Sequence, residues 1–399
     1  MKVGIYNRYW ATMGGGEKHV GTIAEILLAE GHQVDLIRVG PVDEAEFSSR
    51  MNLNLAGAHW VEWPGSSCSE LAPRSAGYDV FINSTYCSSM VPQARKSLYL
   101  AFFPHELIEA APLPRLFQRA AGRFDRTGHP WLSRMSSLAQ RTLRRGVASS
   151  RRPFIDSYED PMANSEFTAA WIRKRWARDA VVLPPPIDVE RFGSVDLSNK
   201  KKVILSVGRF FSGGHNKKHI EMITAFRQMH DKGLVPEGWE YHLAGSVHAE
   251  SEEHRRYFQK VNALAEGYPI RILGNLGSRE LLQEYAEASI FWHGAGWGER
   301  GDQEPEKLEH FGMTACEAMA AGVVPIVQPL GGPREVVTDG VDGYYFSDAR
   351  ELQERTLSLM KLYGTPELAQ WAARARASVQ KYSQANFRAG FIKFFNTIA

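Results

Sequence analysis

Strand-like and helix-like runs alternate along this chain, and the alternation starts twice. In the first half, an apolar run over residues 3–6 is followed by three glycines at 14–16 and by a helical pattern over 17–30. The same order returns at residues 203–207, which lead into another glycine-rich turn. Alternation of this kind is typical of parallel sheets covered by helices. We therefore predict an α/β protein with two sheet-and-helix units.

Short apolar runs predict the remaining strands. They cover residues 34–37, 80–83, 97–102, 241–244, 270–273, 290–292 and 324–327. Three consecutive prolines at 184–186 cannot continue a helix and suit a linker. We therefore expect an N-terminal Rossmann-like domain over residues 1–186 and a C-terminal one over residues 187–383. The aromatic, helical stretch 384–399 is expected to pack back on the first domain.

The composition is that of a soluble globular protein with more than one domain. The 399 residues are 44% hydrophobic and 23% charged, and the formal net charge is only +2, so the whole molecule is not a polyanion binder. Three cysteines, Cys68, Cys87 and Cys316, lack metal-ligand spacing and fit a reducing compartment. The first residues lead into a strand rather than a signal peptide, and no apolar run reaches membrane-spanning length. We expect a cytoplasmic protein.

The strongest functional signal is the segment between Glu309 and Gly322. Phe311 and Gly312 are typical of a helix entry, where unpaired N–H groups and a partial positive charge favour a phosphate. If the segment is helical throughout, Glu309 and Glu317 lie roughly 12 Å apart, from eight residues at about 1.5 Å rise each. That is about the reach of a sugar joined through a diphosphate to a ribose. An amphipathic helix with two exposed acids fits the spacing equally well.

Cations follow the first strand of the second unit. Arg209 comes directly after the strand predicted over residues 203–207, and Lys217 and Lys218 open a helix predicted over 217–230. Together they can clamp a diphosphate, since arginine offers a fork of donors and lysine a point charge. Ordinary surface charge is the alternative, but the position after a strand favours a binding role for Arg209.

Two features of the first unit each allow two interpretations. A loop with Gly15 and Gly16 lets backbone N–H groups approach a phosphate or a sugar, or it is simply a flexible tight turn. The dinucleotide fingerprint is not met, because His19 stands where its third glycine would be. His105 follows the apolar run 97–102 and either faces the cleft to bond a sugar hydroxyl or lies in the core, satisfied by backbone groups.

Residues 115–152 are strongly basic, with ten arginines against Asp125 as the only acid and apolar side chains between them. Such a segment suits docking on an anionic membrane surface, and a solvated helical face is the plain alternative. We expect no nucleic-acid partner, because no recognition motif accompanies the arginines. The chain has no aspartate–any–aspartate triplet and no His/Cys cluster with ligand spacing, so we expect neither a metal nor another cofactor.

Taken together and in this order, these motifs resemble those of the GT-B glycosyltransferases of family 4, a large retaining family. The resemblance covers nearly the whole chain and is strongest from Glu309 to Gly322, which is similar to the family's E-x7-E element. Supporting matches are residues 14–17, 164–165, 184–188, 206–209 with Lys217, 324–327 and 331–337. The resemblance implies a GT-B fold, in which the first domain binds an acceptor and the second binds a nucleotide sugar across a cleft.

The resemblance also implies a role for each motif residue. Glu309 would contact hydroxyls of the transferred sugar and Glu317 would hold the ribose. Arg209 and Lys217 would neutralise the diphosphate as it leaves, with Lys218 as the alternative to Lys217. The expected catalytic residues are Glu309, His105, Arg209 and Lys217, although the residues around His105 differ from the family's common pattern. Further residues expected to touch the donor are Gly15, Gly16, Gly274, His310, Phe311, Gly312 and Met313.

The implied reaction keeps the anomeric configuration and needs no metal, and the leaving diphosphate would assist deprotonation of the acceptor hydroxyl. Residues 102–105 and 292–298 look most like the mannosyltransferase-like branch that extends lipid-linked or surface glycans such as lipopolysaccharide. This favours GDP-mannose as donor and a peripheral place at the inner membrane face. Competing hypotheses are a nucleotide-sugar epimerase or phosphorylase on the same fold, and a non-catalytic glycan-binding subunit.

Overall fold

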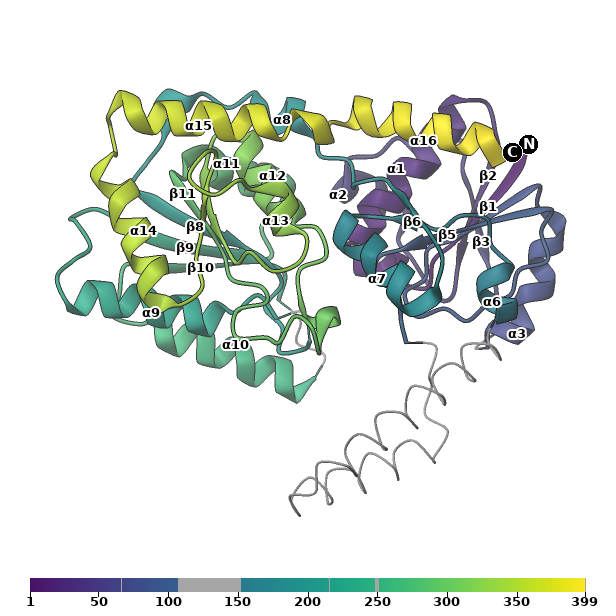
Figure 1. Ribbon diagram of the computed structural model, residues 1–399, viewed down its shortest axis with the longest axis horizontal. Helices are drawn as coiled ribbons and strands as arrows, with labels where there is room; N and C mark the ends of the chain where they lie inside the picture. Colours follow the sequence, from purple (N-terminus) through teal and green to yellow (C-terminus); the bar gives the residue numbers. More distant parts are fainter. Residues whose placement is uncertain (66, 107–151, 215, 248–250, 399) are drawn as a thin grey trace, which may run out of the picture.

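The computed structural model describes residues 1–65, 67–106, 152–214, 216–247 and 251–398. Two parallel sheets with helices on their faces form two domains that lie side by side (Figure 1), which confirms the predicted fold class. Apart from Arg152, the arginine-rich stretch predicted over 115–152 lies outside the described residues. None of the described helices combines the length and the apolar character needed to cross a membrane.

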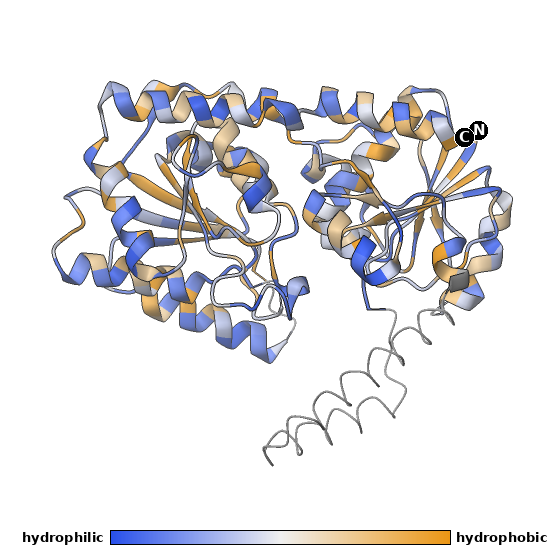
Figure 2. Cartoon of the chain, in the orientation of Figure 1, coloured by the Kyte–Doolittle hydropathy of each residue, from blue (hydrophilic) through white to orange (hydrophobic). Residues whose placement is uncertain are grey.

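The first sheet has the strand order β3-β2-β1-β4-β5-β6-β7. In chain order its strands are β1 (Lys2–Tyr6), β2 (Gln33–Arg38), β3 (His59–Glu62), β4 (Val80–Asn83), β5 (Lys96–Ala101), β6 (Met162–Ala163) and β7 (Val181–Val182). The pairing is parallel, with Ile5 of β1 opposite Leu36 of β2 on one side and Ile82 of β4 on the other. Strands buried on both faces have continuous apolar sequences, and Figure 2 shows this apolar interior.

The second sheet has the strand order β10-β9-β8-β11-β12-β13 and is also parallel. Its strands are β8 (Val203–Val207), β9 (Glu240–Gly245), β10 (Ile270–Gly274), β11 (Ile290–His293), β12 (Val324–Val327) and β13 (Tyr344–Tyr345). In both sheets the order reverses beside the first strand, next to β1 and next to β8. Ligands of such sheets bind at the carboxyl ends of the strands near this point.

Helices cover both sheets (Figure 1). Those of the first domain are α1 (Gly15–Ala29), α2 (Glu44–Met51), α3 (Cys68–Leu71), α6 (Arg152–Asp156) and α7 (Glu166–Trp176), with short 3-10 helices η1 (Trp10–Thr12) and η2 (Ala72–Gly77). Those of the second are α8 (Val189–Gly193), α9 (His219–Asp231), α10 (Glu252–Ala265), α11 (Ser278–Glu287), α12 (Met313–Ala320), α13 (Pro333–Val336), α14 (Ala349–Lys361) and α15 (Pro366–Ser378), with η4 (Leu197–Asn199), η5 (Pro305–Lys307) and η6 (Gln380–Tyr382). The chain ends in α16 (Gln384–Ile398).

Helix α1 begins earlier than predicted, so Gly15 and Gly16 form its first turn instead of a loop. Glu17 explains the early start, because its side chain satisfies polar groups of the preceding residues. Its Oε2 accepts hydrogen bonds from the N–H of Gly14 at 3.0 Å and from the hydroxyl of Thr12 at 2.7 Å. A glutamate in the first turn that reaches back in this way is a common helix N-terminus.

Two helix starts in the second domain also differ from the prediction. Helix α9 begins at His219 rather than Lys217, because Lys218 has left-handed backbone with φ of 61°. Helix α12 begins at Met313, after Gly312 with φ of 106°, a conformation that glycine adopts without strain. Glu309 therefore precedes the helix, and the continuous helix from Glu309 to Glu317, on which the 12 Å estimate depended, does not exist.

The chain crosses between the domains twice at the same place. Ile187, just after the three prolines, pairs with Ser383, just before α16, and its N–H donates to the carbonyl of Tyr382 at 2.8 Å. Helix α16 then lies against α1, where Phe387 and Phe391 join the apolar core of the first domain. The expected boundary at 186/187 lies between β7 and β8.

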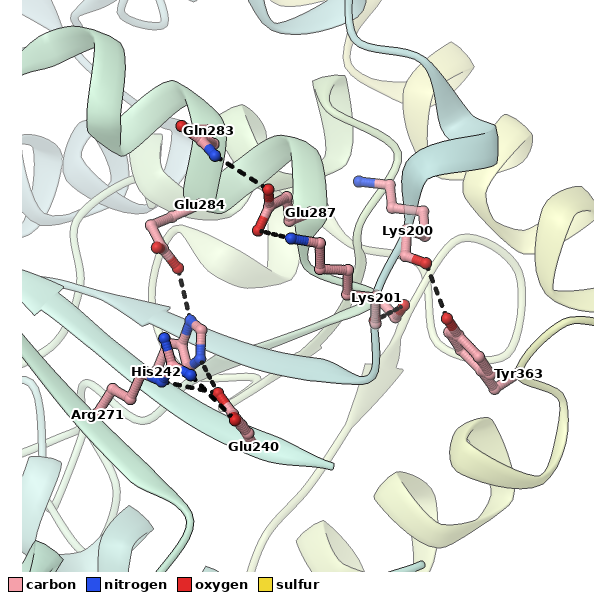
Figure 3. A network of polar contacts seen from close by, with 10 residues as sticks. Lys200, Lys201, Glu240, His242, Arg271, Gln283, Glu284, Glu287 and Tyr363 are labelled. Carbon is pink, nitrogen blue, oxygen red and sulfur yellow. Dashed lines mark hydrogen bonds and ion pairs between the residues drawn. The ribbon is translucent and has the colours of Figure 1, made fainter. Parts of the chain in front are cut away.

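A polar network holds α11 to the second sheet (Figure 3). His242 of β9 lies between two carboxylates, with Nδ1 2.6 Å from Glu284 of α11 and Nε2 2.9 Å from Glu240. Arg271 of β10 reaches Glu240 at 2.8 Å. Buried polar groups are costly unless paired, and here both ring nitrogens have partners. The network therefore fixes the helix whose first turn borders the site described next.

Candidate functional site

A cavity of about 310 Å³ lies between the domains at the carboxyl ends of β8, β9 and β10. Among the described residues, the first domain lines it with the segment before α1, with Lys18 and with the end of α2. The second domain lines it with Arg209, the start of α11 and Glu317. This is the end of a parallel sheet where ligands bind, and the volume suits a small molecule.

Two helix starts from opposite domains meet at this cavity. Gly15 at the start of α1 and Met313 at the start of α12 both line it. A Cβ at Gly15 would lie 2.8 Å from the Sδ of Met313, so the absence of a side chain permits the close approach. Helix starts carry unpaired N–H groups and a partial positive charge. The rim between these two therefore favours an anionic group such as a phosphate.

Glu317 lines the cavity from the second turn of α12. Its Oε2 accepts a hydrogen bond of 2.8 Å from the hydroxyl of Tyr285 on α11. Burial raises the pKa of Glu317 to about 7, although Tyr285 and the charges of Arg191 and Lys18 act in the opposite direction. The carboxylate can accept hydrogen bonds from hydroxyl groups of a ligand, and its charge changes near neutral pH.

Glu309 lies beside the cavity in an ion pair with Lys217. The Nε2 of His293 is 3.2 Å from the same carboxylate oxygen. Burial opposes the negative charge, but Lys217 and His293 hold the pKa of Glu309 well below its usual range. The stem of Lys217 packs on Gly208, a residue of the cavity wall, where a Cβ would lie 2.5 Å from the lysine Cγ. An ionised, fixed carboxylate thus adjoins the cavity.

The two neighbouring lysines pair with different carboxylates. Lys218 forms an ion pair of 2.6 Å with Glu299, whereas Lys217 pairs with Glu309. Arg209 lines the cavity itself, and its guanidinium lies 5.5 Å from the ring centroid of Phe211. Of the three predicted cations, Arg209 is therefore the one that the structure brings into the cavity wall.

The predicted site residues divide into two groups. Those that line the cavity are Gly15, Arg209, Met313 and Glu317. His105 is not among the lining residues, because its imidazole packs against Phe154 and Trp176 with ring centroids 5.5 and 5.6 Å away. His105 thus lies among aromatic side chains of the first domain.

Five other predicted residues do not line the cavity in the described structure: three lie directly before α12, Gly16 lies in the first turn of α1, and Gly274 ends β10. The ring of His310 stacks on Phe103, Phe311 packs on Tyr382, and Gly312 caps α12. Gly16 faces Phe102, whose ring would lie 3.2 Å from a Cβ, and Gly274 ends β10.

Several polar residues of the cavity wall were not predicted from the sequence, among them Lys18, Asp188, Arg191 and Asn275. The ammonium group of Lys18 donates to the carbonyls of Met51 and Asn52. Arg191 donates to the hydroxyl and carbonyl of Ser278 at 2.6 and 2.7 Å. Asp188 is the last residue of the motif 184–188, whereas no motif marks the other three residues. They come together only because α1 and α8 belong to domains that face each other.

Residues 190–378 match the family model of the glycosyl transferases group 1. The match covers nearly all of the second domain. The matched region contains Arg209, Glu309 and Glu317, and the first domain adds Gly15 and Lys18 to the cavity wall.

Named relatives align with the chain at modest identity. The GDP-Man:Man(3)GlcNAc(2)-PP-Dol alpha-1,2-mannosyltransferase of Xenopus laevis is 28% identical over 253 residues, covering 58% of this chain and 47% of that protein. The trehalose synthase of Pyrococcus horikoshii is 27% identical over 224 residues, covering 51% of this chain and 48% of that protein. The chain therefore spans about half the length of these relatives.

A solved structure extends the likeness to both domains. The crystal structure of Anabaena Alr3699/HepE in complex with UDP matches with a TM-score of 0.69 at 13% identity and covers 100% of both chains. Likeness at this identity establishes a shared fold. The two domains together thus have the GT-B fold, as the motifs predicted.

Proposed function

We propose that this protein is a glycosyltransferase that moves a hexose from a nucleotide-diphosphate sugar to a hydroxyl of a glycan or lipid-linked saccharide. One observation carries the proposal: Arg209 and Glu317 line the same cavity, and the Glu309–Lys217 pair lies beside it. A cation and a carboxylate therefore line one cavity, and a second carboxylate lies near its wall. The group 1 glycosyltransferase match that covers them supports the same function.

The side chains of the cavity wall determine where each part of the donor lies. The nucleoside lies against Leu276 and Leu281, and its ribose hydroxyls donate to Glu317. The diphosphate lies near Arg209 and the two helix starts, where N–H groups and a guanidinium favour negative charge. The hexose extends toward Glu309, whose ionised carboxylate accepts hydrogen bonds from sugar hydroxyls.

The reaction we infer is the retaining, metal-independent transfer of family 4. As the bond between the diphosphate and the sugar breaks, the leaving diphosphate accepts the proton of the acceptor hydroxyl on the same face. Arg209 and Lys217 stabilise the charge that develops, and the facing domains hold the reactants and limit access of water. Rates in EDTA should equal those in magnesium, and NMR of the product should show the anomeric configuration of the donor.

GDP-mannose is the donor that we favour. The Xenopus laevis relative is named for GDP-Man, whereas HepE was crystallised with UDP, so base and sugar require a direct test. A thermal-shift panel of GDP, UDP, ADP and their sugars provides it, because a ligand of the folded state raises the Tm. We expect the largest shift with GDP and GDP-mannose. If no nucleotide raises the Tm, the proposed function is wrong.

We further propose that residues 115–152 bring the protein to an anionic membrane surface, so that it acts as a peripheral enzyme at the cytoplasmic face. The ten arginines of this segment support the proposal, because each basic residue near an anionic surface adds to the attraction. Replacing several of them should lower cosedimentation with anionic liposomes. Equal binding of both proteins would contradict the membrane role.

A further inference from the structure

We propose, on the basis of the function proposed above, that Phe103 and Arg175 of the first domain position Glu309 of the second. The place of the sugar-binding carboxylate then depends on the contact between the two domains. Phe103 follows β5, and Arg175 belongs to α7. Neither is among the described residues that line the cavity, so both act through the segment that carries Glu309.

An aromatic stack joins the domains next to Glu309. The ring of Phe103 lies 4.3 Å from the imidazole of His310, centroid to centroid, with 15° between the planes. Phe103 is 1% exposed, and the ring of Phe167 stacks against it at 5.8 Å. His310 is the next residue after Glu309, so a shift of its imidazole moves the backbone of the carboxylate.

Arg175 provides a second tie on the other side of Glu309. Its Nη2 is 3.0 Å from Oε2 of Glu306 in η5, and its Nη1 donates to the carbonyl of Pro104 at 2.7 Å. The guanidinium also lies 5.1 Å from the ring centroid of Phe103. With 11% of its side chain exposed, Arg175 connects the turn after β5 to the segment before Glu309.

Glu335 of α13 adds a third contact across the domains. Its carboxylate accepts hydrogen bonds from the N–H groups of Glu166 and Phe167, at 2.9 and 2.7 Å, at the first turn of α7. The carbonyl of Glu309 accepts from the N–H of Gly332, directly before α13, at 2.9 Å. Helix α7 thus binds α13 through Glu335, and the residue before α13 binds the backbone of Glu309.

The carboxylate is therefore held within the second domain, whereas the position of its backbone also depends on the first. Lys217 and His293 bind the carboxylate within the second domain, while Phe103 and Arg175 fix the backbone from the first. A misplacement of about 1 Å can cost roughly a hundredfold in rate. Loss of the stack should loosen the segment around Glu309 and leave the nucleotide contacts of Arg209 and Glu317 in place.

Calorimetric titrations with GDP and with GDP-mannose test this positioning without knowledge of the acceptor. GDP measures only the nucleotide contacts, whereas GDP-mannose adds those of the sugar. Phe103→Ala should leave the Kd for GDP unchanged and weaken GDP-mannose about tenfold, the size of a lost hydrogen bond to a charged group. Phe103→Tyr keeps the ring and should restore the affinity.

His310→Ala removes the same stack from the other domain and should reproduce the selective loss. The double variant should lose no more than either single variant, because both changes remove one contact. Should Phe103→Ala fail to fold, His310→Ala still provides the test. Additive losses, an equal loss for GDP and GDP-mannose, or wild-type affinity in both single variants would overturn the positioning.

Phe81→Ala is the matched control. Phe81 is also a fully buried aromatic residue of the first domain with a stacked partner, Trp63, at 5.9 Å and 7°, but it belongs to the core cluster around Tyr6. It should lower the Tm and change neither Kd.

If UDP and UDP-glucose bind instead, the same comparison uses that pair. Wild-type protein that binds none of the four refutes the proposed function, and the positioning falls with it.

Discussion

Tyr285 of α11 donates a hydrogen bond of 2.8 Å to Glu317 of α12 at the wall of the interdomain cavity. The contact fixes one carboxylate oxygen, while Glu317 still lines the cavity. Burial brings its pKa to about 7, so its charge depends on pH in the physiological range. This relationship makes nucleotide binding the most informative property to follow with pH.

Affinity for GDP-mannose should increase as the pH rises from about 6 to 8, because ribose hydroxyls donate to the ionised form of Glu317. GDP-mannose is the suitable probe, since its phosphates are both esterified and do not titrate in this range. Calorimetry of the wild type and of Glu317→Gln checks the effect. The variant should bind about tenfold more weakly at pH 8 and show a flat profile. A pH dependence of equal slope in both proteins would contradict the role of Glu317.

The same pKa predicts a gain in stability from Glu317→Gln. The folded-state pKa of about 7 lies above the ordinary value of 4.5. The folded protein therefore binds more protons between these values, and wild-type stability falls as the pH rises through this window. Urea unfolding at pH 5 and about pH 8 should show this decline, and Glu317→Gln should reduce it. A wild-type stability that rises across the window, relative to the variant, would show that the pKa is not raised.

Glu309→Gln should lower turnover by about a hundredfold or more, because an amide cannot supply the fixed charge. The Tm should fall less than in Glu309→Ala, since the amide loses the charge but its oxygen can still accept a hydrogen bond from Lys217. Glu309→Ala should in addition cost up to about 3 kcal/mol, because it leaves Lys217 half-buried without its partner. Glu299→Gln is the matched control: Glu299 is equally exposed, at 19%, and pairs with Lys218. Initial rates that are equal in the two Gln variants would exclude Glu309 from the reaction.

Replacing the adjacent lysines should separate their roles. Lys217→Met is expected to slow GDP release from GDP-mannose about a hundredfold, since it removes a cation beside the leaving diphosphate. Lys218→Met should keep most of the activity, because its ammonium pairs with Glu299 and not with Glu309. The opposite order of rates would assign the diphosphate to Lys218.

His242 should make the second domain less stable as the pH rises (Figure 3). Burial favours the neutral ring, but hydrogen bonds to Glu284 and Glu240 outweigh it and raise the pKa above 6.5. The stabilisation is complete below pH 6.5 and is lost as the pH passes the folded-state pKa. His242→Gln should lower the free energy of unfolding by about 2 kcal/mol at pH 6 and by less at pH 9. Identical losses at both values would show that protonation is not involved.

The sequence was most informative where burial alone determines the pattern. Strands such as β1 and β8 are covered on both faces, so their apolar runs predicted them directly. The two-residue strands β6, β7 and β13 are too short to leave a pattern. Helix starts were misplaced where a single side chain or φ decides them, as with Glu17 before α1 and Lys218 before α9.

The candidate site was predictable only in the part that lies on recognisable motifs. Arg209 follows a strand, Glu317 lies in the second turn of a helix, and both line the cavity. Lys18 and Arg191 line it too, but their position depends on how the domains face each other, which no local pattern encodes. His105 follows a strand as predicted, yet the rings of Trp176 and its neighbours surround it, and only tertiary packing decides that outcome.

A crystal structure of the complex with GDP is the measurement that decides whether this cavity is a donor site. We predict a nucleotide between the domains, with its diphosphate contacting Arg209 and its ribose hydroxyls bonded to Glu317. GDP bound elsewhere, or bound in this cavity without either contact, would contradict the assignment.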